Sequence, residues 1–212
     1  LNDYFLALYN DNNITYRKDF NEQHLITATM GFRVNTNTFQ EDWGIAKNSN
    51  QNDEYRSLQS GTSYMREMGG HSNKWNRLGM YSQLNYTFRD RYLLHAGVMS
   101  ETSSNIGRNA KVEGVNDLIM LGEVPFGLFY SLGGAWRISN ESFLQDYAWL
   151  EDLKLRLTWG RAGNDDIGSE DNLRYYQIKL YRESSGMVPG NLSDRTLRFE
   201  TGTQLNPGID LT

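Results

Sequence analysis

The feature that most constrains this chain is an alternation of apolar and polar residues with a period of two. At residues 78–88 the even-numbered positions are mostly apolar, and the odd-numbered ones are mostly polar or glycine. Successive side chains of a β-strand point to opposite faces, so the pattern predicts a strand with one apolar and one polar face. The pattern recurs at 24–34, 92–98, 127–138 and 152–160, and more weakly at 4–9, 173–181 and 197–211. The sequence therefore predicts an all-β chain of about eight strands.

The length of these segments favours a membrane barrel over a soluble sandwich. Most run for about 9 to 12 residues, whereas ordinary strands have about five or six and a tilted strand that crosses a bilayer needs about 9 to 11. Their polar faces carry Gln83, Arg137, Lys154 and Arg156, which a water-filled lumen tolerates and a packed core does not. We therefore predict a transmembrane antiparallel β-barrel segment with its apolar face toward lipid.

Connection lengths predict which end of the barrel faces the periplasm. Bacterial barrels have short periplasmic turns and longer outer loops. The two-residue turn at Arg89 and Asp90 is short, so we expect it on the periplasmic side. By parity the long connections 35–75 and 100–126 are extracellular, and 139–151 is periplasmic. Beyond residue 160 the chain returns to the outside, and 173–181 is either a spanning strand or a hairpin within a long outer loop.

Charge and motif content exclude several classes of function. Lys plus Arg total 21 against 26 Asp plus Glu, with both signs interspersed, which disfavours a nucleic-acid partner. The chain has no cysteine and none of the commoner catalytic signatures. We therefore predict no enzyme activity, no catalytic or metal-ligating residues and no cofactor. An acidic stretch at 164–171 lacks the spacing of a calcium-binding EF-hand loop and is predicted to be a solvated turn.

The candidate ligand-binding residues are aromatic and lie in the long connection at 35–75. They are Trp43, Tyr55, Tyr64 and Trp75, with Arg56, Arg66 and Asn73 close by in sequence. Flat rings can stack on a sugar or a peptide while guanidinium and amide groups hydrogen bond at its edges. The alternative is that these rings pack the loops against one another above the barrel.

Four strings of sequence follow one another along the chain, with spacings that suit a barrel. Residues 85–94 read NYTFRDRYLL, and residues 131–143 read SLGGAWRISNESF. Residues 149–164 read WLEDLKLRLTWGRAGN, and residues 197–211 read LRFETGTQLNPGIDL. These strings resemble segments of the SusC/RagA family of TonB-dependent outer-membrane transporters, in which a tryptophan is usual at the position of Phe199.

The resemblance implies that this chain is an internal fragment from the C-terminal part of a barrel of about 22 strands. Residues 1–212 would all belong to a single β-barrel domain, without the signal peptide and the plug domain of full family members. The implied function is import of oligosaccharides or peptides across the bacterial outer membrane, to which this chain would contribute barrel wall and extracellular loops. The implied partners are a SusD-like surface lipoprotein, the TonB complex through an N-terminal region absent here, and outer-membrane lipid.

Two other functions remain open from the residues alone. About eight strands of these lengths also fit a self-contained eight-stranded outer-membrane barrel with a structural or adhesive role. A soluble carbohydrate-binding β-sandwich is the third possibility. In the sandwich the leucines and tyrosines of the strands would turn inward to form a dry core, whereas in either barrel they would face outward.

Overall fold

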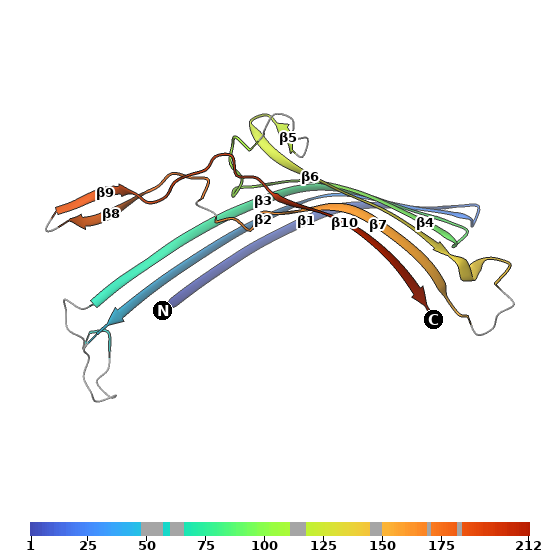
Figure 1. Ribbon diagram of the computed structural model, residues 1–212, viewed down its shortest axis with the longest axis horizontal. Coiled ribbons are helices and arrows are strands. Elements are labelled where there is room, and N and C mark those ends of the chain that lie inside the picture. Colours follow the sequence, from blue (N-terminus) through green and yellow to red (C-terminus); the bar gives the residue numbers. More distant parts are fainter. Residues whose placement is uncertain (48–56, 60–65, 111–117, 145–149, 169–170, 182–183) are drawn as a thin grey trace.

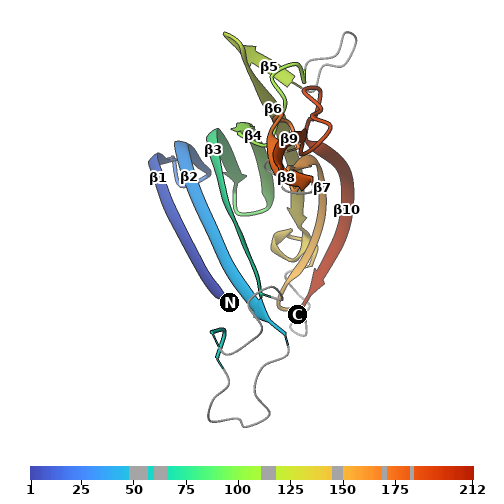
Figure 2. The same cartoon turned by 90° about the vertical axis from the view of Figure 1, so that its left-hand side faces the viewer.

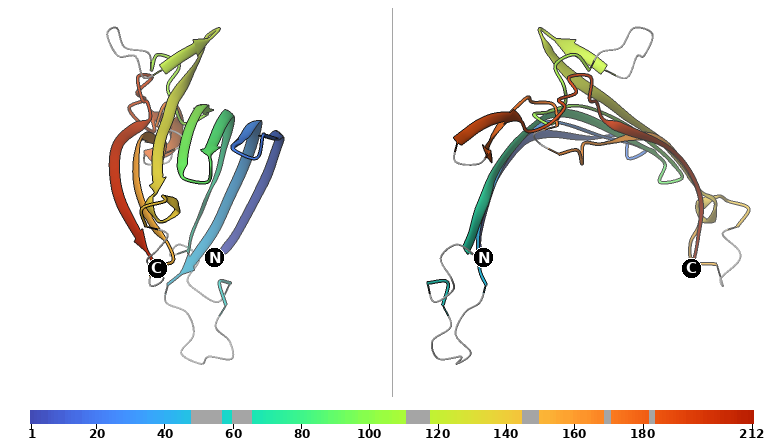
Figure 3. Two further views of the ribbon diagram at one scale, coloured as in Figure 1. Left: turned by 90° about the vertical axis from the view of Figure 1, so that its right-hand side faces the viewer. Right: turned by 60° about the vertical axis from the view of Figure 1, so that its left-hand side comes forward.

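An eight-stranded antiparallel sheet is the main element of the fold. The computed structural model describes residues 1–47, 57–59, 66–110, 118–144, 150–168, 171–181 and 184–212. The longer strands run side by side and bend into an arch (Figures 1 and 3). They are β1 (Asn2–Phe20), β2 (His24–Ala46), β3 (Arg66–Phe88), β4 (Tyr92–Ser103), β6 (Val124–Arg137), β7 (Leu153–Asn164) and β10 (Glu200–Leu211).

Neighbours in this sheet follow the order of the chain. The order is β1-β2-β3-β4-β6-β7-β10, with the short strand β5 (Leu118–Leu121) paired to β6 (Figure 2). A 3-10 helix, η3 (Ile138–Asn140), follows β6. The part of the chain that the structure describes contains no helix with the length and hydropathy that a membrane crossing requires.

The two shortest connections and the one between β6 and β7 lie at one end of the sheet, here called the turn end, and the other long connections lie at the other, the loop end (Figure 1). Asn21 and Glu22 join β1 to β2 with φ of 56° and 55°, and Arg89 and Asp90 join β3 to β4 with φ of 51° and 53°. Two successive positive φ values give a turn whose twist matches that of the flanking strands. Each connection includes a third residue, Gln23 in the first and Arg91 in the second, so the second has one residue more than predicted.

Cross-strand register divides the sheet into an apolar face and a polar face. Ala28, Leu84, Ala96 and Leu132 lie in one row across β2, β3, β4 and β6. Leu84 is 47% exposed and Leu132 is 52% exposed, so the apolar face is not covered by protein. This arrangement contradicts the soluble sandwich, in which leucines form a dry core. The predicted transmembrane antiparallel barrel segment is confirmed.

The two edges of the sheet are β1 and β10, which do not pair with each other among the described residues. The self-contained eight-stranded barrel, which requires closure between its first and last strands, is therefore not formed. The number of strands in the sheet agrees with the prediction, but their identity differs in one place. The segment predicted at 173–181 contributes β8 (Tyr176–Tyr181), which pairs only with β9 (Ser184–Pro189) in a separate hairpin. Of the two alternatives for this segment, the hairpin is correct.

Several strands are longer than the alternation predicted. The predicted connection at 35–75 is largely strand, because β2 and β3 stay paired out to Ala46 and Arg66. Likewise β1 extends to Phe20, well beyond the predicted 4–9. In these extensions polar residues such as Asn37 and Gln40 occur on both faces, so hydrophobic periodicity disappears while the ladder of backbone hydrogen bonds continues.

The buried apolar residues form a small cluster on the polar face near the loop end. Ile106, Ala110 and Phe199 are each at most 6% exposed, and Leu118 and Phe129 pack against them. Phe199 meets Phe129 edge to face with 5.1 Å between ring centroids. This cluster binds the connections after β4 and before β10 to the wall of the sheet.

Candidate functional site

The four strings that carry the family resemblance meet at the turn end. Arg137 Nη1 lies 2.7 Å from Asp90 Oδ2, and its Nε lies 3.3 Å from Asp152 Oδ1. One guanidinium group thus joins three of the strings. In the fourth, Asp210 Oδ2 lies 2.8 Å from Lys154 Nζ. These residues tie neighbouring strands together, which is a structural role and not a ligand-binding one.

Glu141 holds the connection after β6 against the ends of β4 and β6. Its carboxylate accepts hydrogen bonds from the Tyr92 hydroxyl at 2.8 Å and from Trp136 Nε1 at 3.0 Å. Arg91 Nη1 lies 2.9 Å from the same carboxylate. The Tyr92 hydroxyl above all, then the Trp136 indole, and then the charge of Arg91, hold the pKa of the Glu141 carboxyl below its usual value, although partial burial opposes them.

A row of aromatic rings crosses four strands on the apolar face at the turn end. His24 and Phe88 have ring centroids 4.8 Å apart, Phe88 and Tyr92 are 6.2 Å apart, and Tyr92 and Trp136 are 6.3 Å apart. Rings at one level of an apolar wall are the arrangement expected of a girdle at a membrane surface. This row marks the level at which the apolar band ends.

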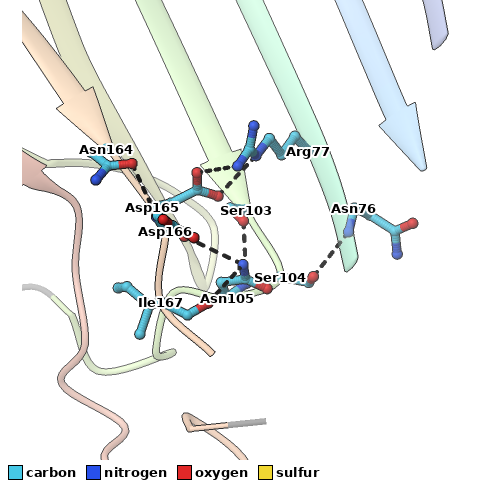
Figure 4. A network of polar contacts seen from close by, with 9 residues as sticks. All are labelled: Asn76, Arg77, Ser103, Ser104, Asn105, Asn164, Asp165, Asp166 and Ile167. Carbon is cyan, nitrogen blue, oxygen red and sulfur yellow. Dashed lines mark hydrogen bonds and ion pairs between the residues drawn. The ribbon is translucent and has the colours of Figure 1, made fainter. Parts of the chain in front are cut away.

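At the loop end, a segment after β7 crosses the polar face of β3 and β4. We call residues 165–168 and 171–172 the strap. Asp165 of the strap is 4% exposed and bonds Arg77 of β3 through both carboxylate oxygens, with Nε–Oδ2 at 2.9 Å and Nη2–Oδ1 at 2.5 Å (Figure 4). The prediction of a solvated turn is therefore wrong at Asp165, because a basic partner from a distant strand buries this carboxylate.

Two asparagines fasten the strap to the end of β4 by matching contacts. Asn105 Nδ2 donates to the carbonyl oxygens of Asp165 and Ile167, at 3.4 and 3.3 Å (Figure 4). In the opposite direction, Asn172 Nδ2 donates to the carbonyl oxygens of Ser104 and Ile106, at 2.8 and 2.9 Å. Each side chain thus satisfies two carbonyl groups of the other segment. Both asparagines are at least nine-tenths buried, and the amide oxygen of each has no hydrogen-bond partner among the described residues.

A cavity of about 230 Å³ lies between the strap, the middle of β3 and the turn that follows β4. It is lined by Asn73, Trp75, Arg77, Asn105, Asp165, Asp166 and Ile167. Trp75 supplies a flat aromatic wall, and most of the other lining residues are polar. The cavity opens on the polar face of the sheet.

Of the candidate ligand-binding residues, the structure places Trp43 and Trp75 apart from each other. Trp75 lines the cavity and also lies against Phe5, with 6.3 Å between ring centroids. Trp43 is on the same face but six residues farther along β2 than Asn37, the partner of Trp75, which corresponds to about 20 Å. Its ring covers Gly69. Tyr55 and Tyr64 lie outside the described residues. The assignment of all four aromatic residues as ligand-binding therefore remains a prediction.

Sequence reasoning did not find the strap or its partners. Arg77 and Asp165 are separated by 88 positions, and no short motif signals that they meet. Asn105 and Asp166 have no distinctive spacing either. The only signal was the acidic character of residues 164–171, which was assigned to solvent.

Comparison with known proteins agrees with the geometry. The chain is 27% identical over 98% of its length to TonB-dependent receptor P39 of Formosa agariphila, and covers 19% of that protein. It is 26% identical over 69% of its length to TonB-dependent receptor SusC of Bacteroides thetaiotaomicron, and covers 14% of that protein. No protein-family model matches the chain. The chain thus spans about a fifth, or less, of the length of these relatives.

Solved structures share the fold. The RagAB peptide transporter matches 99% of this chain with a TM-score of 0.78 at 22% identity, and the match covers 22% of the transporter chain. The RagAB peptide importer in its closed-closed state matches with a TM-score of 0.79 at 23% identity. The resemblance to SusC/RagA-type TonB-dependent transporters is confirmed, as is the predicted location in the bacterial outer membrane. As predicted, the relatives are receptors and transporters, not enzymes.

Proposed function

We propose that this chain, which resembles SusC/RagA-type TonB-dependent receptors, is an internal wall segment of a nutrient importer of the outer membrane. Residues 1–212 are then part of a single β-barrel domain. The chain supplies seven long adjacent strands of the wall, together with the loop-end segments that narrow the lumen. Its role is to shape and line the passage, and it carries no chemistry of its own.

The observation that carries this proposal is the opposite character of the two faces of one sheet. Leucines such as Leu84 and Leu132 stay exposed on the apolar face, which is favourable only where hydrocarbon covers them. The other face carries charged pairs such as Arg77 with Asp165, which suits an aqueous lumen. A strap fastened across that face leaves a polar cavity at the loop end.

The cargo is proposed to be oligosaccharides or peptides. Aromatic and amide side chains at the loop end, above all Trp75 and Asn73, supply stacking and hydrogen bonding suited to either class. A SusD-like surface lipoprotein is the proposed partner at the loop end, and the TonB complex is the proposed source of energy. Affinity-tagged importer should recover the lipoprotein from detergent-solubilised outer membranes.

Disruption of the gene tests the proposed import. The disrupted strain should lose uptake of one class of labelled oligosaccharide or peptide, and a plasmid copy should restore it. Loss of the same uptake in a strain without functional TonB is the second expected result, because the relatives are TonB-dependent receptors. Normal uptake of every oligosaccharide and peptide tested after disruption would contradict the proposal.

The candidate aromatic residues of the β2–β3 connection can be tested separately. Replacement of residues 47–65 by a short turn removes Tyr55 and Tyr64 but retains the paired ends of β2 and β3. Uptake should fall while the amount of assembled protein in the outer membrane stays constant. Unchanged uptake would show that Tyr55 and Tyr64 do not hold the cargo.

A further inference from the structure

We propose that a row of aromatic side chains at the loop end of β1, β2 and β3 binds a neutral oligosaccharide by stacking against its sugar rings. The row, here called the stacking row, consists of Phe5, Phe39, Trp43, His71 and Trp75. The inference rests on the proposed import function and narrows the two proposed classes of cargo to one. It draws on the register of the strands, the exposure of the rings and the side chains that flank them.

Strand register places all five rings on the polar face of the sheet. Phe39 of β2 is the direct partner of Phe5 of β1, so both rings point to one face. Trp75 and His71 of β3 are diagonal neighbours of Phe39, two residues to either side of its direct partner, and the rings of His71 and Phe39 have centroids 5.4 Å apart. Trp43 is four residues beyond Phe39 and therefore on the same face. The other three rings thus fill the interval of about 20 Å between the two tryptophans.

The rings cover the sheet beneath them and remain accessible themselves. Trp75 and Phe5 have ring centroids 6.3 Å apart, and Asn37, the direct partner of Trp75, is only 6% exposed. In contrast, Phe5 is 59% exposed and Trp43 is 37% exposed. A solute can therefore reach these rings without any movement of the strands.

The stacking row lies beyond the hydrocarbon layer. Its member nearest the membrane, Trp75, is thirteen residues from Phe88 at the turn end. Thirteen residues span about 43 Å of strand, which a tilt of about 40° converts to about 33 Å of depth. The apolar band is about 25 Å tall, so the rings are in water, at the end that the connection lengths place outside the cell. Aromatic surface gathered in one exposed patch is typical of a binding site.

The flanking side chains favour a neutral ligand that donates hydrogen bonds. Asp3 and Glu41 are direct partners on the same face, and an ionised carboxylate only accepts hydrogen bonds. Glu41 Oε2 also lies 3.5 Å from His71 Nδ1. Among the described residues of β1, β2 and β3, this face carries no lysine or arginine on the far side of Arg77 from the membrane. These strands therefore offer acceptors for hydroxyl groups and no basic partner for an anionic cargo.

A sugar fits this face better than a peptide does. An extended peptide is commonly held through main-chain hydrogen bonds to an unpaired strand edge. As far as Asp42, β2 is paired with β1 on one side and with β3 on the other, so the surface between the rings offers no free main-chain groups. The faces of a pyranose ring carry C–H groups that pack on an aromatic ring, while its hydroxyl groups project from the rim toward acceptors such as Glu41.

Ligand binding to the purified full-length transporter in detergent tests the inference. Isothermal titration calorimetry would compare maltotetraose, cellotetraose, xylotetraose and mannotetraose, each with its monosaccharide, and N-acetyl-tetraalaninamide as the peptide. At least one tetrasaccharide should bind at least roughly tenfold more tightly than its monosaccharide, because it covers more than one ring. Failure of every tetrasaccharide to bind, or equal binding of tetrasaccharide and monosaccharide, overturns the inference.

Variants that stay apolar but lack the flat ring locate the site. Phe5→Leu and Trp43→Leu should each weaken binding of that tetrasaccharide roughly five- to tenfold, whereas Phe5→Tyr should retain it. Tyr4→Leu is the matched control, because Tyr4 is the neighbouring residue, is 51% exposed and points to the opposite face. It should leave binding within about twofold. Equal losses in Phe5→Leu and Tyr4→Leu, or no loss in Phe5→Leu and Trp43→Leu, overturn the assignment to the stacking row.

The peptide decides the class of cargo. If N-acetyl-tetraalaninamide binds and Phe5→Leu weakens its binding as much as that of the tetrasaccharide, the stacking row is not specific for sugars and the inference is overturned. Because binding is measured without TonB, the inference can fail while uptake in cells, and its loss on disruption of the gene, remain as proposed. Failure of the inference is therefore distinguishable from failure of the import function.

Discussion

Replacement of Leu84 by arginine tests the assignment of the two faces at a known depth. Leu84 is four residues from Phe88, whose ring belongs to the aromatic row. Four residues span about 13 Å of strand, which a tilt of about 40° converts to about 10 Å of depth. Because the apolar band is about 25 Å tall, Leu84 lies near its middle, where an arginine costs about 2 to 4 kcal/mol.

A neighbouring residue provides the matched control. Gln83 is on the same strand at almost the same depth, but on the polar face beside Thr29 and Gly97. Gln83→Arg should change the free energy of unfolding by less than about 1 kcal/mol, because the new charge stays in water. Leu155→Arg should also cost only about 0 to 1 kcal/mol, since Leu155 is opposite Trp136 at the level of the aromatic row.

The measurement is equilibrium unfolding of the full-length transporter in lipid vesicles, followed by tryptophan fluorescence as guanidinium is added. Wild type, Gln83→Arg and Leu155→Arg should lie within about 1 kcal/mol of one another, and Leu84→Arg should be clearly less stable than all three. If Gln83→Arg is the more destabilising of the two β3 variants, the faces are reversed. If Leu84→Arg is neutral, this face does not contact hydrocarbon.

Three further predictions concern the ties at the two ends. Glu141→Gln should lower the melting temperature near neutral pH. The difference from wild type should shrink as the pH falls through the lowered pKa of the Glu141 carboxyl, because that group stabilises the fold only while ionised. A difference that grows in acid would refute the contact. Arg77→Ala leaves the carboxylate of Asp165 buried without its partner, at a cost of roughly 1 to 3 kcal/mol, and limited proteolysis should then cut the strap faster than in wild type. Gly127→Ala would place a Cβ atom 2.6 Å from the ring of Phe199, so the free energy of unfolding should fall by about 1 to 3 kcal/mol. An unchanged melting temperature would show that this contact relaxes freely.

Local sequence determined which residues share a face and where one of the two tight turns lies. A strand's side chains alternate whatever the rest of the protein does, so the apolar row through Leu84 and the polar position of Gln83 could be read directly. The turn at Arg89 and Asp90 was likewise marked by the break in alternation between two paired segments. The membrane setting was favoured, because hydrocarbon outside and water inside satisfy both faces at once, but the soluble sandwich was excluded only by the exposure of the leucines in the structure.

Only the tertiary structure decided how far the strands extend and what crosses the polar face. Beyond the apolar band, β2 and β3 are held by backbone hydrogen bonds, which leave no pattern in the side chains. The strap depends on Arg77 meeting Asp165 across 88 positions, and on asparagines whose partners are carbonyl groups of another segment. Backbone groups are the same at every residue, and a pairing between distant charges depends on the path of the intervening chain, so neither is encoded in a local string.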